Sequence, residues 1–302
     1  MKDKICIITG SAQGLGKEFT KILLHHGAKV CISDIKEDVA NKTLKELQHS
    51  YGNENVCFVK CDVTKEDEFA NLFNETEKKF NVACVDVLVN NAGINTKLGW
   101  KKCIDVNMIG VMTGCGIALA RMKKASKPGT VINISSMAGI VSPPCGGELV
   151  VGYTVSKAGI VALTKDLAKD FRFHGVCFKT LCPAWTDTEL VSSTKEGIPE
   201  DRVLELERSI KSAGGLMTPE YVAKGFYKLV TECGNGNIMC VIKDTPFLIL
   251  PDDAVFKVLI SVLIAKFIGT LTGNHVITVQ HQKLCCALIV TILCFIILKL
   301  FV

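Results

Sequence analysis

Two side chains that could carry out proton chemistry lie four residues apart, Tyr153 and Lys157. On an α-helix this spacing places both side chains on one face, one turn from each other. A lysine ammonium next to a phenol favours the phenolate, because opposite charge stabilises the ionised form. With its pKa lowered from the usual value of about 10, the tyrosine could take a proton from an alcohol. Taken alone, such a pair is more often two ordinary neighbours on a helix, because this spacing is common.

A glycine-rich stretch follows the first apolar run of the chain. Residues 5 to 8 are typical of a buried strand, and Gly10, Gly14 and Gly16 follow it. Glycines in such a turn let the backbone approach a pyrophosphate, and the next helix points its N-terminus at the negative charge. Asp34 ends the second apolar run, where a carboxylate would bind the adenosine ribose hydroxyls and repel a 2′-phosphate. This arrangement favours NAD over NADP, the alternative being a glycine turn and an unrelated surface aspartate.

For these residues to form one site, the elements that carry them must bring several strand ends together. The apolar runs predict strands over residues 5–8, 29–33, 56–59, 85–89, 130–134, 176–181 and 238–243. Helical periodicity predicts helices over residues 17–26, 39–49, 66–80, 100–121 and 155–173. Strands that alternate with helices predict an α/β fold, a doubly wound parallel sheet of the Rossmann type with about seven strands.

Three motifs occur together along the chain, in the order Thr9-Gly10-x3-Gly14-x-Gly16, Asn90-Asn91-Ala92-Gly93 and Tyr153-x3-Lys157. As a set they resemble the short-chain dehydrogenase/reductase family over roughly residues 3 to 250. Within the family the chain is similar to the NAD-dependent hydroxyprostaglandin dehydrogenases. The segments that carry this similarity are residues 10–14, 61–63, 90–95, 100–107 and 156–161. The resemblance implies an oxidoreductase that acts on CH–OH groups with NAD as its cofactor.

The resemblance also implies roles for single residues. Ser136 would hold the substrate oxygen against Tyr153, Lys157 would bind the nicotinamide ribose, and Asn107 would hold a water next to the lysine. The residues implied to contact the cofactor are Gly10, Ser11, Gln13, Gly14, Leu15, Gly16, Asp34, Ile35, Cys61, Asp62, Val63, Asn91, Ala92, Gly93, Tyr153, Lys157, Pro183, Thr186 and Thr188.

Within that set, the resemblance assigns Asp62 and Val63 to the adenine and Thr186 and Thr188 to the nicotinamide side. The family usually has Pro-Gly where this chain has Pro183-Ala184. A small side chain in place of glycine is expected to alter the course of that loop only slightly.

Three features concern the substrate. The interval between the implied serine and tyrosine is longer than usual, and the added residues fall in the loop-like sequence 143–148. Val150 stands where the prostaglandin enzymes have a glutamine that contacts the substrate hydroxyl. Residues 190–216 correspond to the family's substrate lid. From the motif set we expect oxidation of a secondary alcohol on a hydrophobic molecule, such as a fatty acid, prostanoid or sterol. The alternatives are a carbonyl reductase working in the opposite direction and a membrane-tethered NAD-binding protein without catalysis.

Composition narrows the class of protein. The net charge of +5 is spread without a long basic block, which argues against nucleic acid as a partner. The 15 cysteines include no CxxC pair and no paired metal spacing, so we predict a reduced, cytosolic catalytic domain without a metal site. Family resemblance implies a homodimer or homotetramer formed through the helices at residues 100–121 and 155–173.

The C-terminal part of the chain differs from the rest. Residues 284–302 are apolar apart from Lys299, and their length matches the ~20 residues that cross a bilayer. We predict a catalytic domain over residues 1–252 and a hydrophobic tail over residues 253–302. A transmembrane helix at 284–302 would leave the catalytic domain in the cytosol, on an internal membrane such as the endoplasmic reticulum. Residues 255–271 carry two lysines and are expected to lie in the membrane interface or to form a re-entrant turn. The alternative is a tail that packs on the sheet or on a partner subunit.

Overall fold

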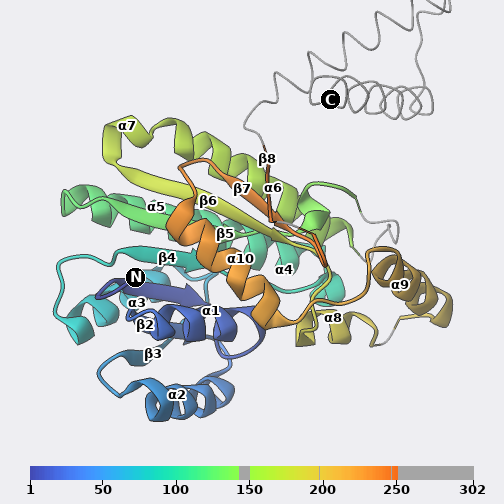
Figure 1. Ribbon diagram of the computed structural model, residues 1–302, viewed down its shortest axis with the longest axis horizontal. Coiled ribbons are helices and arrows are strands. Elements are labelled where there is room, and N and C mark those ends of the chain that lie inside the picture. The colour runs from blue at the N-terminus through green and yellow to red at the C-terminus, as the bar shows by residue number, and fades with distance from the viewer. Residues whose placement is uncertain (143–149, 197, 246, 251–302) are drawn as a thin grey trace, which may run out of the picture. The chain divides into compact units, whose positions relative to one another are not determined.

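The computed structural model of the protein describes residues 1–142, 150–196, 198–245 and 247–250. The predicted loop insert at 143–148, the predicted tail at 253–302 and the transmembrane helix within it lie outside the described residues. The strands are β1 (Ile5–Thr9), β2 (Lys29–Asp34), β3 (Val56–Lys60), β4 (Val87–Asn90), β5 (Gly129–Ile134), β6 (Val176–Pro183), β7 (Ile238–Val241) and β8 (Leu248–Leu250). They form one sheet in the order β3-β2-β1-β4-β5-β6-β7-β8 (Figure 1).

Neighbouring strands are parallel from β3 to β7, and only the β7–β8 pair is antiparallel. The helices are α1 (Gly14–His25), α2 (Glu37–Tyr51), α3 (Glu66–Phe80), α4 (Trp100–Ile104), α5 (Gly110–Lys124), α6 (Val151–Lys169), α7 (Phe171–His174), α8 (Glu189–Thr194), α9 (Glu200–Ser212) and α10 (Pro219–Glu232). The predicted doubly wound, parallel α/β sheet is therefore confirmed.

Helices cover both faces of the sheet and create two large apolar cores (Figure 1). On one face α1, α2 and α10 pack on the strands, and the rings of Phe19 and Phe226 stack with centroids 4.2 Å apart. On the other face α3, α5 and α6 pack on the strands. All five residues of β1 are buried, because alternate side chains of a strand enter opposite cores. This two-sided burial explains why the strands are continuous apolar runs in the sequence.

The order of the strands reverses between β1 and β4. From β1 the chain moves outward to β2 and β3, then returns to β4 on the other side of β1. In sheets of this kind, ligands bind beside such a switch point, at the carboxyl ends of the strands. We therefore expect a binding site at the loops that follow β1, β2, β4 and β5.

The helix predicted over residues 100–121 consists of three parts. A π-helical turn, Asp105–Ile109, separates α4 from α5. Among the described residues, Trp100–Lys124 is the stretch whose length and apolar composition would suffice to cross a membrane. Val111, Cys115 and Ala118 of this stretch are buried in the core against the sheet, and core helices commonly meet the same criterion.

Two elements near the end of the described chain were not predicted. The helix α10 begins at Pro219, and the Thr218 hydroxyl caps it by accepting a hydrogen bond from the Tyr221 amide. The short strand β8 adds an eighth, antiparallel edge to a sheet that was expected to have about seven strands.

Candidate active site

The loop after β1 lies directly against the loop after β4. A Cβ atom at Gly10 would lie 2.6 Å from the Cα of Ala92, and Gly10 has a positive φ of 61°. A Cβ atom at Gly16 would lie 2.4 Å from the Gly10 carbonyl oxygen and 2.6 Å from Nδ2 of Asn91. Only glycine fits at these contacts, so the backbone itself forms the surface of this loop. Such a cradle at the start of α1 suits the close approach of a pyrophosphate.

Hydrogen bonds join the same two loops. The Asn91 amide group donates to the carbonyl oxygens of Thr9, at 2.9 Å, and Gly10, at 2.8 Å. In return the Thr9 hydroxyl accepts from the backbone amides of Asn91 and Ala92, both at 3.1 Å. The two sequence motifs are thus one physical unit, although about eighty residues separate them along the chain.

Asp34 ends β2 with its carboxylate turned toward the glycine loop. One oxygen accepts from the Ala12 amide at 3.1 Å, and the other accepts from the Lys36 amide at 3.0 Å. Ile35 follows with an exposed side chain. The hydroxyl of Ser11 is buried, donates to the Ile8 carbonyl and accepts from the Ser33 amide, so this side chain joins β1 to β2.

The residues implied to contact adenine follow β3. The Asp62 carboxylate accepts from the Thr64 amide at 3.0 Å and from the Thr64 hydroxyl at 2.7 Å. Partial burial favours the neutral acid, but these bonds and nearby lysines outweigh it and lower the pKa of Asp62. Val63 packs against Gly110, where a Cβ atom would lie 2.9 Å from the valine. Cys61 is buried beside them.

Tyr153 and Ser136 are brought together from β5 and α6. Ser136 follows β5 and caps a short 3-10 helix, Met137–Gly139, by accepting from the Ala138 amide at 3.1 Å. Burial raises the pKa of Tyr153 to about 12, and interaction with the Ser136 hydroxyl offsets this only in part. In the protein by itself the pKa of Tyr153 is thus raised, because desolvation is the largest effect, and the lowering effect expected of Lys157 stays a prediction.

Lys157 lies one helical turn after the tyrosine and is 4% exposed. Its ammonium group donates to the Ile134 carbonyl at 2.8 Å and lies 5.6 Å from the centre of the Tyr153 ring. Burial lowers the pKa of Lys157 to about 8. The predicted shared helix face is thus confirmed.

Asn107 belongs to the π-helical turn and is fully buried. Its side-chain oxygen accepts from the Ile94 amide at 2.8 Å, and its nitrogen donates to the Ile94 carbonyl at 2.9 Å. A Cβ atom at Gly93 would lie 3.4 Å from the Asn107 oxygen and 3.5 Å from the Lys157 nitrogen. The asparagine and the lysine therefore flank the loop that follows β4. Insertions of π-helix are frequent at functional sites.

The segment after β6 lies opposite the glycine loop. Pro183 ends the strand, and the Ala184 amide donates to the Val241 carbonyl of β7 at 2.8 Å. Thr186 is buried, and Thr188 occupies the N-cap position of α8. A Cβ atom at Gly14 would lie 3.7 Å from the Thr188 methyl group, so this segment faces the glycine loop. Residues 190–216, which we call the lid because the resemblance implies that role, include α9 and all of α8 except Glu189.

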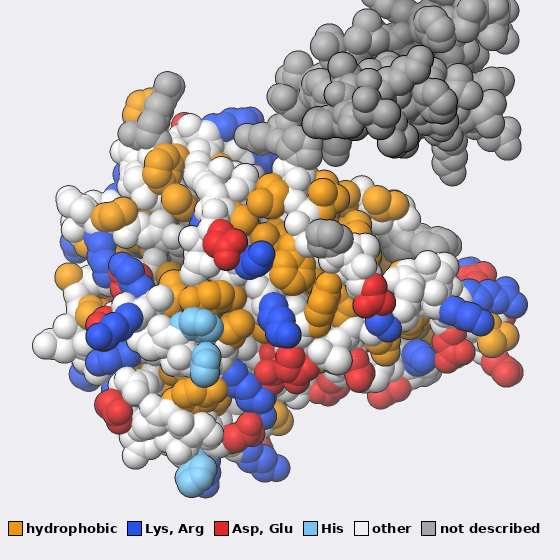
Figure 2. Space-filling model, in the orientation of Figure 1, with side chains coloured by type: hydrophobic (Ala, Val, Ile, Leu, Met, Phe, Trp, Pro, Cys, Tyr) orange, Lys and Arg blue, Asp and Glu red, His pale blue; other side chains and the backbone are white. Residues whose placement is uncertain are grey.

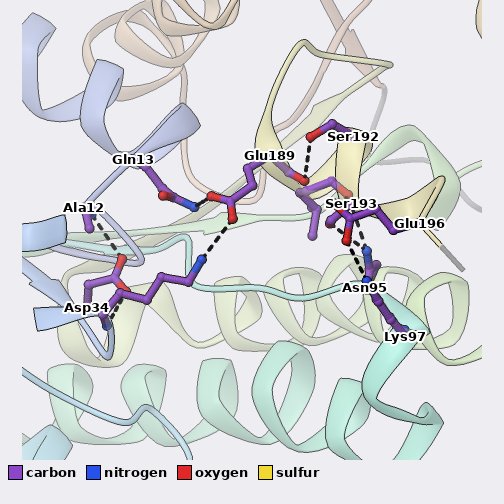
Figure 3. A network of polar contacts seen from close by, with 11 residues as sticks. Ala12, Gln13, Asp34, Asn95, Lys97, Glu189, Ser192, Ser193 and Glu196 are labelled. Atoms are coloured by element: carbon purple, nitrogen blue, oxygen red, sulfur yellow. Dashed lines mark hydrogen bonds and ion pairs between the residues drawn. The ribbon is translucent and has the colours of Figure 1, made fainter. Parts of the chain in front are cut away.

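Sequence reasoning missed the polar contacts that hold the lid. Charged side chains of both signs are interspersed at the α8 and α9 end of the molecule (Figure 2). Glu189, the first residue of α8, accepts from the Gln13 side chain, and the Asn95 side chain donates to Ser193 and Thr194 (Figure 3). These partners lie about a hundred or more residues apart in the chain, so no local sequence pattern predicts their contacts.

A buried amide network was missed as well. The Asn90 side chain donates to Asn133 at 2.8 Å, and Asn133 donates to Thr164 at 3.0 Å. These bonds link β4 to β5 and to α6 beneath the catalytic candidates. Asparagines at or next to the ends of two strands could have predicted this network, because buried side-chain amides need hydrogen-bond partners.

Comparison with known proteins shows the family of the chain. A family model described as short chain dehydrogenase matches residues 4–199. The 15-hydroxyprostaglandin dehydrogenase (NAD(+)) of Mus musculus is 31% identical over 244 residues, which cover 78% of this chain and 88% of that protein. Zerumbone synthase of Zingiber zerumbet is 27% identical over 248 residues, which cover 77% of this chain and 89% of that protein.

The crystal structure of levodione reductase matches with a TM-score of 0.71 at 23% identity and covers 80% of this chain and 97% of that one. This likeness concerns the fold. The family model spans most of the described sheet, including every strand from β1 to β6. The chain therefore belongs to the short-chain dehydrogenase family and is an oxidoreductase that acts on CH–OH groups.

Proposed function

We propose that the protein oxidises a secondary alcohol on a hydrophobic molecule to the ketone, with NAD as the hydride acceptor. One observation carries the proposal: Ser136, Tyr153, Lys157 and Asn107 converge beside a glycine cradle that a Cβ atom would fill. Asp34 at the end of β2 supports NAD rather than NADP, because its carboxylate would repel a 2′-phosphate. Relatives named for NAD-dependent dehydrogenation support the same cofactor.

Each side chain has a separate task in this proposal. The Ser136 hydroxyl holds the substrate oxygen, and Tyr153 takes the proton of the alcohol. Oxidised nicotinamide, when bound, supplies the hydride acceptor and a positive charge. Lys157 adds a second positive charge, which stabilises the phenolate against the burial that raises the tyrosine pKa. Asn107 holds the loop after β4 in place, and we propose that it positions a water beside the lysine for proton exchange.

The choice of a hydrophobic substrate rests on the surroundings of the catalytic candidates. Apolar side chains stand exposed on the segments that follow β4 and β5, namely Leu98 and Val141, and on the lid at Leu216. Exposed apolar side chains on loops around a site are typical of a surface that an apolar ligand covers. Fatty-acid, prostanoid and sterol alcohols share this character, and relatives named for a hydroxyprostaglandin support a prostanoid-like substrate.

A direct assay tests this function. Purified full-length protein is incubated with NAD and a panel of hydroxylated fatty acids, prostanoids and sterols, and NADH is followed by absorbance at ~340 nm. We expect NADH formation with at least one member of the panel, and ketone formation in equal amount. Tight NADH binding without turnover on any alcohol, or on the matching ketones in reverse, would instead support a non-catalytic NAD-binding protein.

We also propose that the protein is a homodimer or homotetramer formed through α5 and α6 and the turn before α5. Ile109, Met112, Val151 and Val155 expose apolar side chains on these elements, which supports burial by a second copy. Light scattering on the Val155→Lys variant should show a smaller assembly than the wild type, whereas Leu204→Lys on α9 should not. Equal masses for the three proteins would count against this interface.

A further inference from the structure

A carboxylate at the start of α8 reaches across to the loop after β1 and to the segment after β2. Glu189 accepts a hydrogen bond from the Gln13 side chain, which stands at the N-cap position of α1. The same carboxylate forms an ion pair with Lys36, whose Nζ lies 3.2 Å from Oε1. Figure 3 shows Glu189 facing Gln13, with Ala12 and Asp34 on the same side as Gln13. Glu189 therefore links α8 to two residues that border the glycine loop.

The other end of α8 is held by different partners. The Asn95 side chain donates to the hydroxyls of Ser193 and Thr194, both at 3.1 Å (Figure 3). The ammonium group of Lys97 lies 2.7 Å from the carboxylate of Glu196, just beyond the helix. Because the helix is tied at both ends, the position of Glu189 over the cleft is set by the fold and not by its ion pair alone.

Lys36 is placed where a cation would matter for the choice of cofactor. Its backbone amide donates to the Asp34 carboxylate at 3.0 Å, so the lysine follows directly the group expected to meet the adenosine ribose. A basic side chain near this carboxylate is what accommodates the 2′-phosphate of NADP. Another lysine beside Asp34 is Lys60, its register partner on β3, and Lys60 is paired with Glu37 at 3.0 Å. These two lysines are thus each paired with a carboxylate.

We propose that Glu189 is a specificity-determining residue, which draws the Lys36 ammonium away from the adenosine ribose and so disfavours NADP(H). The inference rests on the proposed dinucleotide-dependent function and extends it. Asp34 repels a 2′-phosphate directly, whereas Glu189 removes the nearest attractive charge. Glu189 and Lys36 are each about half exposed, so solvent screens the pair and its effect is modest.

The test compares dinucleotide binding by Glu189→Gln, Lys36→Met and the double variant of the full-length protein. The control is Glu196→Gln, which removes the ion pair with Lys97 on the same lid. Dissociation constants for NADH and NADPH are measured by fluorescence titration at one low ionic strength. We expect Glu189→Gln to tighten NADPH relative to NADH by about fivefold, the size of one exposed ion pair. The Glu196→Gln variant should keep the wild-type ratio.

The double variant separates the proposed route from a direct effect of charge. If Glu189 acts through Lys36, its substitution should leave the NADPH-to-NADH ratio of the Lys36→Met protein nearly unchanged. An equal gain in that background would show that Glu189 repels the phosphate itself, and it would overturn the proposal. An unchanged ratio in the single Glu189→Gln variant, with NADH binding intact, would do the same. If the wild type bound neither dinucleotide, the proposed function would fail, and this inference with it.

Discussion

At the scale of single residues, the site is defined by two titratable groups that burial affects in opposite directions. Desolvation raises the pKa of Tyr153 to about 12 and lowers the pKa of Lys157 to about 8, because in each case it disfavours the charged form. The protein alone therefore holds a neutral phenol beside a weakened ammonium. Catalysis as proposed requires the positive charges of lysine and nicotinamide together to lower the pKa of Tyr153, so that the phenolate forms.

The lowered pKa of Lys157 makes a prediction about stability. Between about pH 8 and the usual lysine value of 10.5, the unfolded chain binds more protons than the folded protein. The contribution of this lysine to the free energy of unfolding therefore rises with pH across that window. The free energy of unfolding of the wild type, relative to that of Lys157→Met, should increase by about 2 kcal/mol between pH 8 and pH 10.

Urea unfolding at a series of pH values measures this difference. The matched control is Lys224→Met, since Lys224 is an exposed lysine on α10. Its difference from wild type should stay constant with pH. A constant difference for Lys157→Met as well would mean that the buried lysine keeps an ordinary affinity for its proton.

At the scale of elements, the strands and their terminal loops could be predicted because each carries a local signal. Apolar runs ended by Gly, Asp or Asn mark β1, β2 and β4, and parallel strands must gather those ends at one edge. β8 is too short for such a signal. The pair Thr218-Pro219 is typical of a helix start and could have predicted α10. The π-helical turn has no signal, because the apolar pattern continues through it.

The polar connections between elements could not be predicted for a different reason. The contacts of Glu189 with Gln13 and Lys36 join segments distant in sequence, and charged residues of this kind usually lie free on a surface. The pKa of Tyr153 likewise depends on how deeply the fold buries the phenol, which residue spacing does not report.

The close contact of two loops makes a prediction at this scale. Gly16→Ala would place a methyl group 2.4 Å from the Gly10 carbonyl and 2.6 Å from Asn91, so the glycine cradle would have to open. We expect at least about tenfold weaker NADH binding, measured by fluorescence titration. Gly234→Ala is the control, because its new methyl group would lie 3.6 Å from its nearest neighbour. NADH binding that survives Gly16→Ala unchanged would contradict a role for this cradle.

At the scale of the whole molecule, the sequence of the chain changes in character toward its C-terminal part. The family model matches residues 4–199, whereas residues 284–302 are almost entirely apolar. We propose that this segment spans a membrane and holds the catalytic domain on the cytosolic side, near hydrophobic substrates. Its length matches the ~30 Å hydrocarbon core of a bilayer, and Lys299 can extend its side chain to the far headgroups.

Alkaline carbonate extraction of cell membranes tests the anchor. Full-length protein should stay in the membrane pellet, and a chain that ends at residue 252 should be released to the supernatant. Release of both proteins would mean that the tail packs on the protein or on a partner subunit.

The central claim is that Tyr153 is the proton acceptor of a dinucleotide-dependent oxidoreductase. The Tyr153→Phe variant tests this claim most directly. Turnover with an alcohol accepted by the wild type is measured together with NADH binding, because the phenol acts in the chemical step. We expect kcat to fall by at least about 100-fold, the usual contribution of a general base, while the NADH dissociation constant changes little. A Tyr153→Phe protein that retained wild-type turnover would contradict the account.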